Sequence, residues 1–201
     1  MGHATYSHGH HASVVGAHAA RTVANSAAYL SPLLAPGMRV LDVGCGPGSI
    51  TIDLARRVGS TGRVVGIDMS AEVVETARAA AEQAGVPNVE FRVGDAYDPA
   101  PGEHFDVVHA HQVLQHLGDP VAALTAWRAA GDLVAARDVI YSATTIHPLS
   151  PELARWRELM VALQGANGGD GDAGARLKAW ARAAGFGRIE TDVETWCFES
   201  E

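Results

Sequence analysis

Three glycines at alternate positions follow the apolar segment 39–43, which has the character of a strand. They are Gly44, Gly46 and Gly48. Glycine has no Cβ and adopts positive φ at little cost, so the backbone of this loop can turn sharply and lie close to a ligand. From Ser49 onward the sequence is typical of a helix, whose first N–H groups favour an anionic group. This order predicts a crevice for a nucleotide-like cofactor.

The spacing of the glycines indicates the class of cofactor. Dinucleotide sites have the pattern G-x-G-x-x-G, whereas this loop has G-x-G-x-G, with Ser49 in place of the third dinucleotide glycine. An acid stands two positions ahead of the first glycine. The loop therefore resembles motif I of the class I S-adenosylmethionine-dependent methyltransferases. The resemblance implies that the cofactor is bound by Asp42, Gly44, Cys45, Gly46 and Gly48.

Three further segments follow in the order of that family. A second apolar strand ends in Asp68, which the resemblance implies is the acceptor for both ribose hydroxyls, with Met69 against the adenine face. A third ends in Asp95, implied to accept from the adenine amino group while the N–H of Ala96 meets the ring. The fourth begins at Phe105. Each acid also has a structural interpretation, since Asp68 can simply cap the next helix; the preceding glycine spacing favours the ribose.

Histidines gather at the end of the fourth strand. In-line methyl transfer gains most from alignment of the nucleophile, and a base is needed only for a protonated nucleophile, a role that suits histidine. We expect His116 and His111 to be the catalytic histidines. His116 is expected on the substrate side, and the resemblance also places His111 at the methionine moiety. The alternative for His116 is a helix residue bonded to nearby backbone. His109 is expected to pack on the opposite face of its strand from Ala110.

The N-terminal arm, residues 1–18, carries histidines at positions 8, 10, 11 and 18. Histidine-rich tracts bind metals, but no nearby acid or cysteine completes a ligand set, so we expect no metal. The arm is similar to a segment that folds over the cofactor as a lid in a related methyltransferase subgroup. That similarity implies that Tyr6 and His11 contact the substrate.

Further substrate contacts are expected after the fifth strand. Asp138 and Tyr141 follow its carboxyl end, where ligands bind in open α/β sheets. Trp156, on the next helix, would close the pocket; its alternative is a place in the core.

Alternating strand and helix patterns predict an α/β fold, a Rossmann-like doubly wound, mainly parallel sheet in one domain over residues 19–201. Strands are expected at 39–43, 63–68, 89–93, 105–110 and 133–136, helices at 19–30, 71–85, 153–163 and 174–185, and a flexible glycine-rich loop at 165–174.

Two features depart from the family pattern. The connection before the fifth strand is short, because the helical pattern 122–131 runs almost directly into Leu133. Residues 188–198 have the pattern of a single strand without a turn, so the family's usual seventh strand is missing. An open sheet edge invites pairing. We therefore expect either a homodimer through this edge or a shortened form of reduced stability.

Composition supports an enzyme domain with a small-molecule substrate. The 201 residues are 47% hydrophobic and 19% charged, which is enough for one core. A net charge of −8 disfavours a nucleic acid partner. We find no run of membrane-spanning length and no secretory signal, so no membrane partner is expected. The separated thiols Cys45 and Cys197 favour a reducing, cytoplasmic location.

The sequence thus favours methyl transfer from S-adenosylmethionine to a small organic acceptor, with S-adenosylhomocysteine as product. It resembles the subgroup that includes quinone-biosynthesis and natural-product methyltransferases. Two alternatives stay open. One is a cofactor-binding protein without transfer activity, in a regulatory or scaffold role. The other is a nicotinamide-dependent oxidoreductase, which the glycine spacing disfavours.

Overall fold

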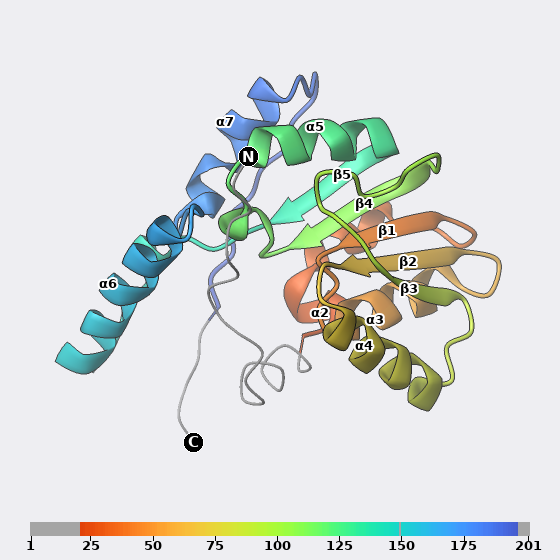
Figure 1. Ribbon diagram of the computed structural model, residues 1–201, viewed down its shortest axis with the longest axis horizontal. Helices are drawn as coiled ribbons and strands as arrows, with labels where there is room; N and C mark the ends of the chain where they lie inside the picture. Colours follow the sequence, from red (N-terminus) through yellow and green to blue (C-terminus); the bar gives the residue numbers. More distant parts are fainter. Residues whose placement is uncertain (1–20, 149, 197–201) are drawn as a thin grey trace.

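The computed structural model describes residues 21–148 and 150–196, and its centre is a parallel sheet of five strands (Figure 1). The order across the sheet is β3-β2-β1-β4-β5. This confirms the predicted fold class and all five expected strands, the last of which begins and ends slightly outside the predicted range. The strands are β1 (Arg39–Val43), β2 (Arg63–Asp68), β3 (Val89–Val93), β4 (Phe105–His111) and β5 (Gly131–Arg137).

Helices cover both faces of the sheet (Figure 1). One face carries α2 (Val23–Ser26), the 3-10 helix η1 (Ala28–Leu33), α3 (Ser49–Val58) and α4 (Ala71–Ala84). The other carries α5 (Pro120–Ala130) and α7 (Ala173–Ala183), while α6 (Pro151–Ala166) projects from the body of the domain. Short 3-10 turns, η2 (Leu114–His116) and η3 (Tyr141–Ala143), follow β4 and β5. Because both faces are covered, the central strands β1 and β2 are buried almost throughout.

Local sequence signals explain where the helices begin and end. Ser70 caps α4 by accepting from the Val73 N–H, and Gly85 ends it in the left-handed conformation. Asp119 caps α5 by accepting from the Ala122 N–H. None of the helices in the described ranges has the length and apolar character needed to cross a membrane.

Three apolar clusters hold the layers together, and the two largest lie on opposite faces of the sheet. On the α5 side, fully buried Trp127 packs with Leu41 and Val108. On the α3 side, Leu30 and Leu54 are buried completely. The indole N–H of Trp127 also donates to the Ala96 carbonyl at 2.8 Å, so the α5 core anchors the loop after β3. Core packing and the position of this loop are therefore coupled.

The short connection before β5 is confirmed and depends on a glycine. Helix α5 ends at Ala130 and β5 begins at Gly131 with no intervening loop. A Cβ at Gly131 would lie 2.7 Å from a methyl group of Val108. Only glycine allows the chain to pass from the helix into the strand this close to β4.

Two expected elements are wrong. The helix expected at 19–30 is broken at Ala27, whose φ of −138° is not helical, into α2 and η1. Residues 188–196 form no strand, and residues 197 and 198 lie outside the described part. This segment is mostly exposed, with Val193 87% accessible, and near its end Glu194 pairs with Arg137 at 3.0 Å without forming a strand. Within the described residues β5 is thus an edge strand, and dimerisation through it stays a prediction.

Trp127→Phe tests the coupling between the core and the loop after β3. The smaller ring leaves a void and the Ala96 carbonyl loses its donor, so we expect about 1–2 kcal/mol less unfolding free energy in urea. Trp180→Phe is the matched control, because Trp180 is only half-buried against the same cluster. Equal losses for the two variants would contradict a special role of the Trp127 N–H.

Candidate functional site

The glycine loop lies at the carboxyl end of β1, and its three glycines have positive φ of 67°, 54° and 85°. A Cβ at Gly44 would lie 2.5 Å from Val113, and one at Gly48 would lie 2.7 Å from Phe91. At Gly46 a Cβ would meet nothing within 4 Å. The outer glycines are therefore required by packing, whereas the central one faces open space in which a ligand can approach the backbone.

Asp68 connects this loop to β2. One carboxylate oxygen accepts from the Gly46 N–H at 3.2 Å and the other from the Ser70 N–H at 3.0 Å. The Cys45 N–H also donates to the Ile67 carbonyl at 2.9 Å. The structure thus supports the capping interpretation of Asp68 in one respect, because the carboxylate holds Ser70, the residue that caps α4. Each carboxylate oxygen keeps a further lone pair for a ligand hydroxyl.

Asp42 lies beneath the loop and not on its surface. Its side chain is only 4% exposed. One oxygen accepts from the Thr51 hydroxyl at 2.6 Å, and the other lies 2.7 Å from Nδ1 of His109. His109 is fully buried on the face opposite Ala110, as expected, and its imidazole also contacts this buried carboxylate. This geometry places Asp42 under the glycine loop, where it supports the loop from within the core.

The loop after β3 holds the residues expected at an adenine ring. Oδ1 of Asp95 accepts from the Tyr97 N–H at 2.9 Å, which closes a tight turn. The carbonyl of Ala96 is fixed by Trp127. Met69, the residue after β2, is 69% exposed. Contacts of Met69, Asp95 and Ala96 with adenine stay predictions.

His111 ends β4 and is only 6% exposed. The Trp196 ring stacks on it with centroids 5.7 Å apart, and the Arg137 guanidinium lies 4.6 Å from the Trp196 ring centroid. The next residue, Gln112, has a φ of +56°, which is uncommon outside glycine. Its side-chain oxygen accepts from Arg21 at 2.7 Å. Sequence patterns gave no signal for this strained position or for its partner, although such strain clusters at functional sites.

Asp138, whose place in a pocket wall stays a prediction, bonds to backbone N–H groups of two segments. Its oxygens accept from the N–H groups of Val139 at 3.0 Å and Gln115 at 3.1 Å, so it joins the end of β5 to η2. Burial raises the pKa of Asp138 to about 7, although hydrogen bonds from the backbone N–H groups of Val139, Gln115 and Leu114 oppose this shift. His116 is the last residue of η2 and is half-buried.

Tyr141 in η3 and Trp156 in α6 contact each other. Their rings contact edge to face with centroids 6.1 Å apart, and Trp156 is 47% exposed, so the core alternative for Trp156 is wrong.

The glycine-rich loop predicted to be flexible is hydrogen-bonded to η2, because the Asp170 N–H donates to the Gln115 carbonyl at 2.9 Å. The amide of Gln164 also donates to the Gln115 side chain at 3.0 Å.

The histidine-rich arm, with Tyr6 and His11, lies outside the described residues. Within the described ranges no group of three or more His, Cys, Asp or Glu side chains is arranged to hold a metal ion.

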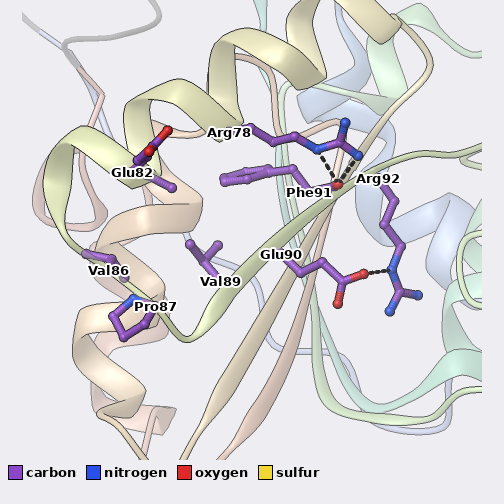
Figure 2. A pocket seen from close by; sticks show the side chains of 9 residues that line it. Arg78, Glu82, Val86, Pro87, Val89, Glu90, Phe91 and Arg92 are labelled. Atoms are coloured by element: carbon purple, nitrogen blue, oxygen red, sulfur yellow. Dashed lines mark hydrogen bonds and ion pairs between the residues drawn. The ribbon is translucent and has the colours of Figure 1, made fainter.

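A surface groove of about 400 Å³ lies away from the glycine loop, between α4 and the outer edge of β3 (Figure 2). Arg78 donates to the Phe91 carbonyl at 3.1 and 2.7 Å, and Glu90 pairs with Arg92 at 2.5 Å. The charged side chains thus bond to one another and to the strand edge, which protects β3 from pairing with another chain.

Comparison with known proteins agrees with this geometry. A sequence model described as a methyltransferase domain matches residues 34–155. An uncharacterised methyltransferase of Schizosaccharomyces pombe is 32% identical over 98% of this chain and 74% of its own length. A ubiquinone biosynthesis O-methyltransferase of Cereibacter sphaeroides is 42% identical, but over only 49% of this chain and 38% of its own.

The fold comparison gives the same result. A solved S-adenosylmethionine-dependent methyltransferase from Aquifex aeolicus has a TM-score of 0.55 and 25% identity, covering 70% of this chain and 79% of that one.

Gly46→Ala tests whether the open space above the loop is a ligand site. We expect about 1 kcal/mol loss of unfolding free energy from the left-handed backbone and loss of measurable S-adenosylhomocysteine binding in calorimetric titration. Gly85→Ala is the matched control, because Gly85 has a similar φ of 62° and its Cβ would also meet nothing within 4 Å. If both variants bind like the wild-type protein, the ligand does not lie over Gly46.

Proposed function

The chain belongs to the class I S-adenosylmethionine-dependent methyltransferases, and from this premise we propose that it methylates a small organic acceptor bound at the carboxyl ends of β1, β4 and β5. Its cofactor is S-adenosylmethionine. The chain spans 74% of the S. pombe relative and 38% of the C. sphaeroides relative. The acceptor and the residues that contact it are therefore part of the proposal.

One observation supports the cofactor site most directly. Asp68 ends β2 with both carboxylate oxygens turned toward backbone N–H groups, one of them that of Gly46, the glycine that faces open space. A carboxylate at this position can accept from two vicinal hydroxyls, as a ribose presents them. Helix α3 begins at Ser49 behind a glycine N-cap with no side-chain cap, so its positive end suits the carboxylate of a methionine moiety. The residues present fit the cofactor.

When bound, the cofactor supplies a methyl group already activated by a sulfonium centre. The protein's task is then to align the acceptor and, for a protonated nucleophile, to take up its proton. We assign His111 to the methionine side, because it ends β4 beside the glycine loop. His116, half-buried at the end of η2, is assigned to the acceptor side.

Aromatic and polar groups surround the acceptor region in this proposal. Tyr141 and Trp156 form an edge-to-face pair on the α6 side, with the Trp156 ring still half-exposed. Asp138 supports the region from behind through the N–H groups it accepts from. The exposed aromatic surface favours a small, largely apolar acceptor over a charged one.

Asp68→Asn tests the cofactor assignment. The amide keeps one acceptor oxygen and loses the charge, so we expect at least about tenfold weaker binding of S-adenosylhomocysteine by calorimetry. Asp132→Asn is the control, because Asp132 is exposed at the opposite end of the sheet, where it pairs with His104 at 3.0 Å. Unchanged affinity in Asp68→Asn would show that the carboxylate does not hold the ligand.

Deletion of residues 1–18 tests the proposed lid. We expect S-adenosylhomocysteine to form much more slowly over a panel of phenol, amine and enol acceptors, with the unfolding free energy unchanged. Double substitution of Tyr6 and His11 by alanine should reproduce most of the loss. Turnover equal to that of the full chain would exclude a catalytic role for the arm.

A further inference from the structure

A polar cluster lies under the glycine loop in an otherwise apolar layer. It consists of Asp42 on β1, His109 on β4 and Thr51 on α3, which are 3%, 0% and 0% exposed. Asp42 and His109 are directly paired in the register of the parallel strands, so both point toward α3 from the same face. The Thr51 hydroxyl completes the cluster at 2.6 Å from Asp42.

Burial of this carboxylate requires an explanation, because a charged group loses its hydration in the interior unless it is hydrogen-bonded. Asp42 is satisfied by two donors, the Thr51 hydroxyl and Nδ1 of His109 at 2.7 Å. The hydrogen of the imidazole is therefore on Nδ1. Among the described residues, Nε2 of His109 has no hydrogen-bond partner. The histidine is thus oriented by Asp42 alone.

The position of Thr51 connects this cluster to the candidate ligand site. Thr51 is the third residue of α3, in the first turn of the helix that directly follows the glycine loop. Gly48, the N-cap, has no side chain with which to fix that turn. The loop ahead of it is held on the β2 side through Cys45 and Asp68. On the β1 and β4 side, the bond from Thr51 to Asp42 holds the helix start.

We propose that His109 is a positioning residue for cofactor binding, which acts through Asp42 and Thr51 to hold the first turn of α3 against the sheet. This inference rests on the proposed function, since it concerns the same ligand site. His109 orients the carboxylate, the carboxylate accepts from Thr51, and the helix start is thereby fixed before a ligand arrives. Such preorganisation increases the affinity for the ligand, because the first turn of α3 loses no conformational entropy when the ligand binds.

Thr51→Val and Thr51→Ser are a matched pair that separates the hydroxyl from the volume of the side chain. Valine retains the shape of threonine and removes the donor, so we expect about five- to tenfold weaker S-adenosylhomocysteine binding in calorimetric titration. Serine retains the donor and should bind within about twofold of the wild-type protein. Equal binding by both variants would overturn the proposal.

Variants at His109 separate positioning from stability. His109→Asn keeps a donor near the position of Nδ1 and should bind S-adenosylhomocysteine close to the wild-type affinity. The double variant Asp42→Leu with His109→Leu replaces the buried pair by apolar side chains, an exchange that often preserves stability. We expect it to retain its urea-unfolding midpoint and yet to bind at least about tenfold more weakly.

Two results would count against the inference in different ways. Wild-type affinity in the double variant would show that the cluster only fills the interior, and would overturn the inference while the proposed function stood. Absence of binding in the wild-type protein itself would overturn both. An imidazole ¹H–¹⁵N spectrum of the ligand-free protein supplies an independent readout. The resonance of the His109 Nδ1–H is expected to be present in the wild type and to shift in Thr51→Val, and its absence would contradict the cluster.

Discussion

The loop between β1 and α3 has to turn within the space left by side chains from three neighbouring elements, and this constraint determines where a ligand can lie. Val113 leaves no room for a Cβ at Gly44, and Phe91 leaves none at Gly48. Of the three glycines, only Gly46 would have open space around a Cβ. Because β1, β2 and β4 are parallel, their carboxyl ends meet at this loop, and the residues that follow them surround the same open space.

Polar atoms beneath and beside the loop keep it in that place. Asp68 holds it from β2, and the cluster of Asp42, His109 and Thr51 holds the helix behind it. The Asp42–His109 contact joins residues 67 positions apart on neighbouring strands, so it depends on the packing of the sheet. The Trp127 indole extends this dependence to the loop after β3. The site is thus held from both faces of the domain.

Much of this could be predicted from sequence, because the strands and the glycine loop are governed by local patterns. Apolar runs, glycine spacing and caps such as Ser70 and Gly85 act over a few residues. The failures have a different origin. Residues 188–196 alternate like a strand but form none and stay mostly exposed, and the helix expected at 19–30 is interrupted at Ala27. The roles of His109, Gln112 and Asp138 depend on partners far away in sequence, which no local pattern reveals.

A crystal structure with S-adenosylhomocysteine bound would test most directly the claim that the glycine loop and Asp68 form the cofactor site. The account predicts a ribose whose two hydroxyls donate to Asp68, with the methionine end passing over Gly46 toward the start of α3. A ligand bound elsewhere, for example in the groove beside β3, or one that occupies the crevice without contacting Asp68, would contradict it.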